Sequence, residues 1–494
     1  MRDHEGIVLE EFNGLWQDGD IDAIPIDHFS EATNIQYFNG GFKTRDGIDL
    51  YQSLGTALGN ILRIHPYRMQ TGLTLLVLDA SGNIHHVVSS TVTHNNILSI
   101  ATMTDFNTVS IAGRAYITPF FTDSNGIEKG ITSQFLYVYL GAGVAARKAA
   151  GPTAGGAVAV ANGAAGFTDA GLHVFGVVGE TDTGYLSPPT ALNSFTTSAA
   201  LSVSFSSVPT FTGSFWAKRH IVASVKVLNF NGDLDGYQLF FIPNATINDN
   251  VTTTLANVSF YDADLIDDAS HLLDNLTEIP AGVGLTVYHN RLVLTTTFSD
   301  ISVAYVSNPG EPEAFNQVDG ILIVPLDGNP LTNAQVFRDI LYLFKNTRTV
   351  GYSDNQDVPS TWVPFVVDET IGAPVHGVAT VLDSGGVNVD YLFIAGYNGI
   401  MLFNGSYVKP AFTAKIRDLW LALDRTLFRR IEIINNSITE KIYVVLTDGT
   451  ILYGDYENGL GWEEVKWAHW TFNLNVTTLE IIETVKVVIG SKNT

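Results

Sequence analysis

The sequence predicts an all-β protein, and three observations lead to this class. Short apolar segments alternate with Gly, Asn and Asp turns along most of the 494 residues. Aromatic side chains are abundant, with 28 Phe, 19 Tyr and 7 Trp, and they suit half-buried pleated surfaces. A strand–turn–strand unit recurs at intervals of roughly 40 to 50 residues, as the blades of a β-propeller do. We therefore expect a propeller of about six or seven blades.

The repeated unit can be followed along the chain. It first occurs at 61–69, 73–78 and 84–88, and it recurs at 338–344, at 390–396 with 400–403, and at 440–446 with 450–453. Asn398-Gly399 and Asp448-Gly449 separate two of these strand pairs, at positions where a two-residue hairpin turn requires positive φ. An array of β-sandwiches would give a similar spacing and is the alternative architecture.

The repeat is interrupted between residues 151 and 280. A Gly/Ala-rich segment, 151–165, opens the interruption, and alternating strands follow at 171–178, 201–205, 217–225 and 237–242. Blade-like sequence resumes at Leu285. The interrupting segment resembles a fibronectin III-like β-sandwich, and we expect it to fold on its own and to project from the propeller.

Composition restricts the partners of the chain. Its formal net charge is −24 and only 15% of its residues are charged, well below the usual quarter, so part of the surface is expected to be covered by another chain. An acidic protein gains nothing from counterion release on DNA. The absence of Cys excludes disulfides, zinc–thiolate sites and cysteine nucleophiles, and it fits assembly in a reducing cytoplasm. No run of about twenty apolar residues predicts a membrane span.

Two segments resemble a known family. Residues 12–49 begin with the arm Phe12-Asn13-Gly14-Leu15, pass through a Pro-containing turn and the strand 35–38, and end at the turn Arg45-Asp46-Gly47. The second segment combines the strands 285–292 and 304–307 with the loop Pro309-Gly310-Glu311-Pro312. In this order, these elements resemble the β-propeller hub and nozzle proteins in the tails of short-tailed phages.

The resemblance implies a structural protein of the virion tail, without enzymatic activity. Members of that family commonly form hexameric rings around the DNA-ejection channel, below a portal and adaptor, and they carry fibres or spikes outside. It implies for this chain a homo-oligomeric ring assembled in the host cytoplasm, contacts with such tail proteins, and passage of viral DNA without specific binding. The alternative is a polysaccharide-acting propeller enzyme or lectin, which the low charge disfavours because a lone soluble enzyme needs no buried interface.

The domain boundaries follow from these patterns. We divide the chain into an N-terminal arm (1–33), a first part of the propeller (34–150), the inserted sandwich (151–280) and a second part of the propeller (281–494). Family chains usually end with a further strand after a Gly-Ser turn, whereas here 487–490 is followed only by Ser-Lys-Asn-Thr. The last blade therefore lacks a strand, unless the segment 35–48 supplies it and removes a sheet edge.

No residue pattern predicts a catalytic site, a cofactor or a metal. Nucleophile elbows, His-Glu-x-x-His helices and phosphate-binding loops are absent from the sequence. Asp18, Asp20 and Asp22 alternate as calcium ligands do, but the Gly and bidentate Glu of a calcium loop are missing, so a solvated arm is the favoured interpretation.

The densest aromatic cluster lies near the C-terminal end. Trp462, Trp467 and Trp470 fall within nine positions, 462–470. A carbohydrate-binding platform is one interpretation, and packing in a blade core is the favoured one. Asp233 and Asp235, in a second Asp-rich stretch, are interpreted as a hairpin tip.

Interface residues are expected first in the arm. Phe12, Leu15 and Trp16 are apolar anchors in a segment with little apolar periodicity before Ile35. Because buried aromatic anchors dominate many interfaces, we expect the arm to pack on a neighbouring chain and not on its own propeller.

A helix predicted over 411–428 provides the second set of interface residues. Ile416, Leu419, Trp420 and Leu423 share one face at helical spacing. An acidic lumen would let DNA pass without binding, so basic side chains are expected at subunit interfaces. The candidates are Arg417, Arg425, Arg429 and Arg430, with Lys415 beside them.

Overall fold

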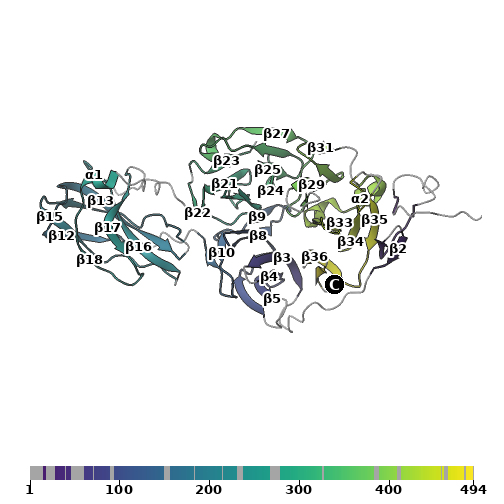
Figure 1. Cartoon of the computed structure of the whole chain (residues 1–494), viewed down its shortest axis with the longest axis horizontal. Coiled ribbons are helices and arrows are strands. Elements are labelled where there is room, and N and C mark those ends of the chain that lie inside the picture. Colours follow the sequence, from purple (N-terminus) through teal and green to yellow (C-terminus); the bar gives the residue numbers. More distant parts are fainter. Residues whose placement is uncertain are drawn as a thin grey trace, which may run out of the picture.

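Short antiparallel strands joined by tight turns form most of the chain (Figure 1). The computed structural model describes residues 15–17, 28–38, 41–45, 60–69, 72–88, 94–149, 156–182, 184–213, 215–230, 237–266, 279–316, 318–324, 327–382, 389–408, 413–457, 459–460, 465–482 and 486–492. Gly449 has the positive φ expected of its turn, 80°, and Gly399 closes the turn between its two strands with φ 145°.

Sequential strands form small sheets around a common centre (Figure 1). The all-β prediction is confirmed, and this arrangement is that of a β-propeller. The first three sheets are β3 (Ile61–Met69), β4 (Gly72–Asp79), β5 (Asn83–Val88) and β6 (His94–Ser99); β7 (Asp105–Ile111), β8 (Arg114–Thr122), β9 (Glu128–Gly130), β10 (Tyr137–Tyr139) and β11 (Arg147–Lys148); and β19 (Leu285–Tyr288), β20 (Arg291–Thr295), β21 (Val303–Asn308), β22 (Glu311–Phe315) and β23 (Ile321–Ile323).

The remaining sheets of the ring follow in chain order. They are β24 (Leu331–Phe337), β25 (Ile340–Lys345), β26 (Thr349–Tyr352) and β27 (Pro364–Asp368), with the 3₁₀-helix η3 (Pro359–Thr361) before β27; β28 (Val378–Leu382), β29 (Val389–Gly396), β30 (Gly399–Phe403) and β31 (Tyr407–Val408); β32 (Glu432–Asn436), β33 (Lys441–Val445), β34 (Ile451–Asp455) and β35 (Lys466–Trp470); and the pair β36 (Asn475–Ile482) and β37 (Lys486–Lys492).

The first strand of each sheet lies toward the centre. Strand β3 contacts β7 and β36, β7 contacts β19, β19 contacts β24, and β28 and β36 both contact β32. The two-stranded sheet β36–β37 fills the space between β32–β35 and β3–β6. Val488 and Ile482 pack with Ile64 on one side, and Val487 and Ile489 pack toward the core of β32–β35 on the other.

The inserted segment forms two facing sheets beside the propeller (Figure 1). Apolar side chains from both sheets, including Phe175, Phe205 and Trp216, form a core of their own. The three-stranded sheet is β12 (Ala159–Ala165), β15 (Leu201–Ser206) and β18 (Leu255–Val258); the four-stranded sheet is β14 (Asn193–Thr197), β13 (Gly171–Thr181), β16 (Trp216–Ala223) and β17 (Phe240–Ile247), and the short helix α1 (Asp262–Ile266) follows.

The described parts of the N-terminal arm pack on the chain's own propeller, which corrects the expectation that they pack on a neighbour. Leu15 is 1% exposed, lies in the core of β32–β35 and donates its backbone N–H to the Trp467 carbonyl at 3.0 Å. Trp16 is half-buried and packs edge-on against His28. Weak periodicity misled the prediction because an extended segment needs no repeat to bury one side chain.

The hairpin of β1 (Ile35–Phe38) and β2 (Gly41–Thr44) follows the arm. Thr33 pairs in parallel with His469 of β35, and the Trp470 indole N–H donates to the Ile35 carbonyl at 2.7 Å. In the described residues the segment therefore covers β35, and the sheet β36–β37 keeps two strands. The described part of the segment 35–48 does not add a strand to β36–β37: β1 and β2 pair with each other, and the Ile35 carbonyl accepts the indole N–H of Trp470 on β35.

Leu15 anchors this segment, and its replacement tests the contact. Leu15→Ala is expected to lower the free energy of unfolding by about 2 to 4 kcal/mol, because a cavity forms in a closed core. Phe42→Ala, at a side chain that is 46% exposed, is the matched control and should change stability by less than about 1 kcal/mol. Chemical denaturation of both variants measures the difference; equal effects would show that Leu15 does not anchor the arm.

The predicted helix over 411–428 is interrupted. The described part consists of η4 (Ala414–Ile416), α2 (Arg417–Leu421) and η5 (Arg425–Arg430). Ile416, Trp420 and Leu423 are buried, as the periodicity predicted. The continuous helix is wrong because Asp424 has an extended backbone, with ψ 110°, and its carboxylate caps the backbone N–H of Thr426, so a new turn begins there.

Candidate functional site

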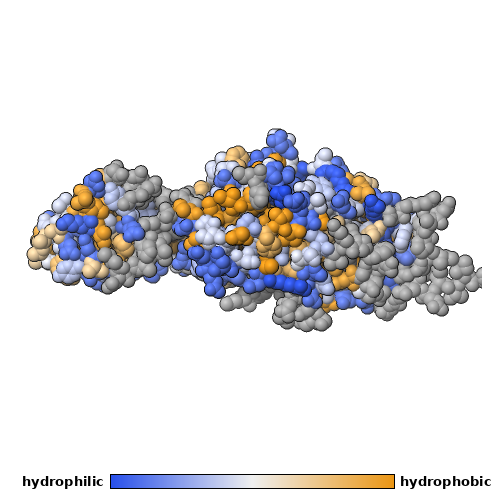
Figure 2. Space-filling model, turned by 90° about the horizontal axis from the view of Figure 1, so that it is seen from above, coloured by the Kyte–Doolittle hydropathy of each residue, from blue (hydrophilic) through white to orange (hydrophobic). Residues whose placement is uncertain are grey.

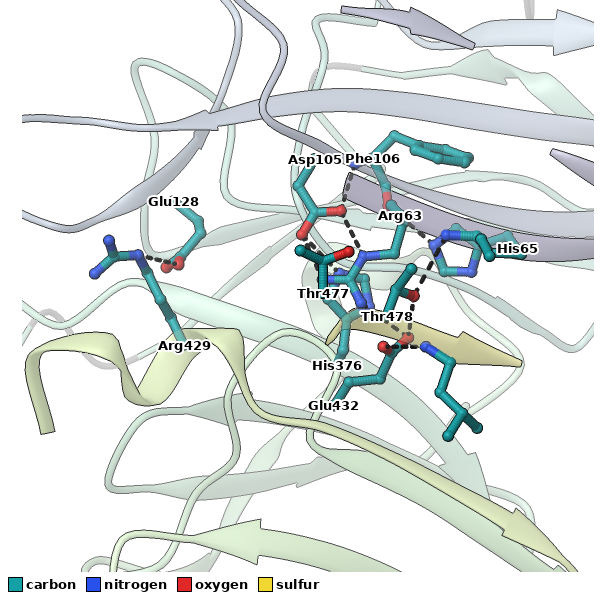
Figure 3. A network of polar contacts seen from close by, with 12 residues as sticks. Arg63, His65, Asp105, Phe106, Glu128, His376, Arg429, Glu432, Thr477 and Thr478 are labelled. Atoms are coloured by element: carbon teal, nitrogen blue, oxygen red, sulfur yellow. Dashed lines mark hydrogen bonds and ion pairs between the residues drawn. The ribbon is translucent and has the colours of Figure 1, made fainter. Parts of the chain in front are cut away.

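A buried network of charged side chains joins four elements at the centre of the propeller (Figure 3). Arg63 comes from β3, Asp105 begins β7, Glu432 begins β32, and His376 lies just before β28. Each lies at or near the inner strand of a different sheet, so the fold brings together residues that are far apart in the sequence. Nothing in the sequence pattern singled them out, because they belong to four segments that are far apart in the sequence.

Arg63 is the central member of the network. Its Nε and Nη2 donate to the two carboxylate oxygens of Asp105 at 2.9 and 2.8 Å, and its Nη1 lies 2.8 Å from Glu432 Oε1. His376 Nε2 lies 3.2 Å from the second oxygen of Asp105. Arg63 and Glu432 are both 4% exposed, and the Asp105 side chain is 19% exposed, so a buried guanidinium bridges one buried and one half-buried carboxylate.

Strand β36 completes the network. Thr478 donates its hydroxyl to Glu432 Oε1 at 3.2 Å, and the backbone N–H of Leu479 donates to Oε2 at 3.1 Å. The Thr477 hydroxyl donates to the Ile61 carbonyl of β3 at 2.6 Å. These bonds tie the last sheet to the first, and therefore close the ring with side chains as well as with packing.

The network sets the protonation of its neighbours. Burial alone would raise the pKa of Asp105, but Arg63 and His376 overcome it and hold that pKa well below its usual range. Burial, with His376 and Arg63 nearby, lowers the pKa of His65 to about 3, so His65 is neutral. Burial raises the pKa of Glu128 to about 7, against the opposing effect of Arg429, whose Nε lies 3.4 Å from the carboxylate.

Glu480 gives the network a dependence on pH. Burial, with Glu432 nearby, raises the pKa of Glu480 to about 8. The folded protein then keeps this proton up to about pH 8, whereas the unfolded chain releases it near the ordinary pKa of about 4.3. Between these values the folded state binds more protons, so its stability falls as pH rises.

Glu480→Gln removes that titration. The variant is expected to be more stable than the natural chain by about 1 to 3 kcal/mol at pH 9, where the natural chain holds a half-buried carboxylate, and to match it below about pH 4. Denaturation midpoints between pH 4 and 9 measure this difference. A constant difference at all pH values would show that Glu480 does not keep its proton in the fold.

The predicted interface arginines occupy different environments. Arg417 and Arg430 are exposed. Arg425 is half-buried and donates to the backbone carbonyls of Tyr397 and Trp420, and Arg429 pairs with Glu128. These contacts of Arg425 and Arg429 lie within the chain. Phe12 lies outside the described residues.

Other residues named from the sequence are accounted for by packing or lie outside the described part. Trp467 is fully buried and Trp470 is 8% exposed, in the core of β32–β35, so these two side chains do not form an exposed carbohydrate platform. Residues 18–27, 231–236 and 461–464, which carry the remaining Asp and Trp candidates, are outside the described residues.

The contacts of this network join different sheets of the propeller. Within the described ranges, no three His, Asp or Glu side chains are grouped so that they could hold a metal ion. No helix in that part of the chain is long and apolar enough to cross a membrane. The Arg63 guanidinium contacts the carboxylates of Asp105 and Glu432, and Asp105 in turn contacts the His376 imidazole, so the network links the sheets that carry these residues.

A second feature lies on the outer rim of the propeller. Figure 2 looks onto the rim that faces upward in Figure 1, and hydrophobic side chains gather there. Val363, Phe365 and Val366, at or before β27, are 77%, 42% and 48% exposed, and Ile323 of β23 is 61% exposed. We call these four residues the apolar rim. Tyr352 connects its two parts, because it pairs with Pro364 and donates its hydroxyl to the Ile323 carbonyl at 3.2 Å.

Comparisons with known proteins find only solved structures of low sequence identity. No family model matches the chain, and no curated protein matches it. Among solved structures, the chain is similar to the WD40 repeats of RRP9, with 8% identity, TM-score 0.42 and coverage of 89% of this chain and 88% of that one. It is also similar to BamB from Moraxella catarrhalis, with 9% identity, TM-score 0.32 and coverage of 87% and 83%, and to Hsv2 from Kluyveromyces lactis, with 11% identity, TM-score 0.31 and coverage of 83% and 97%.

Proposed function

We propose that the chain is a structural subunit that assembles with copies of itself into a ring, as a hub or nozzle of a phage tail. The observation that carries this proposal is the apolar rim. Monomeric soluble proteins rarely leave several large apolar side chains together on their surface, and such patches mark interaction sites. With 15% charged residues, the chain has little charge elsewhere to compensate for this exposure.

The propeller's filled centre supports a ring made of several copies. Arg63 and Glu432 are buried between the inner strands, so a DNA channel would lie between the subunits and not along the axis of one propeller. We propose a hexamer, acidic toward its lumen, that contacts adaptor- or portal-side proteins and fibres or spikes in the virion. The proposed family, the hub and nozzle proteins, comes from the resemblance of residues 12–49 to those proteins.

We further propose seven blades and a fibronectin III-like insertion. Six sheets with four or five strands and the pair β36–β37 occur in the described part of the ring, so the pair would be a seventh, shortened blade. A three-stranded sheet facing a four-stranded sheet is the sandwich arrangement that fibronectin III domains share.

Light scattering coupled to size-exclusion chromatography tests the proposed function on the purified full chain. We expect a particle of about six times the chain mass of 53.6 kDa and ring-shaped images in negative stain. A chain that stays monomeric at tens of micromolar would contradict the ring, and turnover of a polysaccharide would favour the enzyme instead.

A further inference from the structure

Strand β27 differs from the outer strands β6, β31 and β35 of the propeller. It ends the sheet order β24-β25-β26-β27, so no described strand lies beyond it. An outer strand presents unpaired backbone groups, and proteins normally protect it with charges, short length or a covering segment. The outer strand β35 is covered by residues 32–34 of the same chain, β31 has two residues, and β6 exposes Asn95 and Asn96. Strand β27 instead exposes Phe365 and Val366.

The surroundings of β27 are acidic. Residues 349–372 contain Asp354, Asp357, Asp368 and Glu369, and no Lys or Arg. Asp357 and Glu369, which precede and follow β27 in the sequence, are exposed. A binding partner for this surface would therefore carry an apolar side chain with basic side chains around it. The apolar side chain would cover the rim, and the basic side chains would pair with the acidic residues.

A surface elsewhere in the described part of the chain has that chemistry. The segment 413–430 carries Lys415, Arg417, Arg425, Arg429 and Arg430 against Asp418 and Asp424. Within it, Leu421 of α2 is 45% exposed, and Arg417 and Arg430 are exposed on either side of it in the sequence. Figure 1 shows α2 and β27 at different places on the propeller, so one copy cannot bring them together by a small movement.

We propose that the apolar rim of one copy binds the surface formed by Arg417, Leu421 and Arg430 of a second copy. This inference rests on the proposed ring and names its contact. Two different surfaces meet in it, and such a head-to-tail contact closes into a ring when the rotation allows. The apolar side chains exclude water at the centre of the contact, while the arginines face the acidic residues at its margin.

The contact is tested with two variants that each remove one surface. Val366→Lys places a charge on the edge strand, and Leu421→Glu places one on α2; both positions are exposed, so the fold should keep its thermal unfolding profile. Each variant is expected to weaken self-association by roughly a hundredfold or more and to elute as a monomer. Ile438→Lys, at a side chain 70% exposed between β32 and β33, is the control and should assemble like the natural chain.

Mixing the two variants separates this contact from a general loss of assembly. Val366→Lys keeps an intact α2 surface and Leu421→Glu keeps an intact rim, so an equimolar mixture should form one-to-one dimers that cannot grow. Light scattering then reports twice the mass of the chain. A mixture that stays monomeric, or a variant that still forms rings, overturns the proposal while the natural chain's ring stands; a natural chain that is monomeric contradicts the proposed function itself.

If Val366→Lys or Leu421→Glu unfolds, the milder variants Val366→Ser and Leu421→Ser are used instead. These changes remove apolar contact without adding charge. Rings of unchanged stability from both Ser variants would count against the proposal.

Discussion

Replacing Arg63 with methionine is expected to destabilise the propeller strongly. The variant leaves Asp105 and Glu432 without the guanidinium that lies 2.8 Å from each. Breaking a buried ion pair by removing one partner costs about 3 to 5 kcal/mol, because an uncompensated charge stays in the interior. Denaturation of the variant at pH 7 measures this loss.

Two further variants test whether the loss of stability comes from the buried network or from the removal of any positive charge. Lys218→Met removes an exposed partner of Glu180, whose carboxylate lies 2.9 Å from the ammonium group, and should cost about 1 kcal/mol or less. Adding Asp105→Asn and Glu432→Gln to the Arg63→Met variant removes both stranded charges and should recover much of the stability. Equal losses from the Lys218 and Arg63 variants would refute a structural role for the network.

The sequence predicted the local parts of this fold well. The turns at Gly399 and Gly449 and the buried positions Ile416, Trp420 and Leu423 follow from backbone conformation and from helical spacing, which are properties of neighbouring residues. The interruption at Asp424 escaped prediction because a capping carboxylate competes with the helix only in its final geometry.

Contacts between distant residues could not be predicted in the same way. The sequence indicates that Leu15 is an apolar anchor, but it does not indicate whether Leu15 packs on its own propeller or on a neighbouring chain. The structure places Leu15 in the core with Trp467. Arg63, Asp105 and Glu432 lie on three different strands, and their meeting depends on the closure of the whole ring. The apolar rim likewise depends on β27 being the last strand of its sheet.

Arg147 holds the inserted sandwich against the propeller, and its replacement with methionine is the second change with a large expected effect. Its Nη1 and Nη2 lie 2.9 and 3.1 Å from the two carboxylate oxygens of Glu313 on β22. On the side of the sandwich, its guanidinium lies 3.6 Å from Asp182 and stacks over the Phe215 ring at 5.0 Å. One side chain therefore contacts two sheets of the propeller and the base of the sandwich.

Arg147→Met should produce two separable effects. Glu313 is 2% exposed, so loss of its guanidinium should cost about 3 to 5 kcal/mol of stability. The sandwich should also lose its fixed orientation relative to the propeller, because the same guanidinium makes the contacts to Asp182 and Phe215. Small-angle scattering of the variant should then show a broader distribution of distances at the long end.

The double variant Arg147→Met, Glu313→Gln separates the two effects. Removing the stranded carboxylate should restore most of the stability, whereas the direction of the sandwich should stay variable, because neither substitution replaces the contacts to Asp182 and Phe215. Lys218→Met, within the sandwich, should change neither measurement. A scattering profile of Arg147→Met that matches the natural chain would mean that other contacts, such as Tyr185 against Ala314, are enough to hold the sandwich in place.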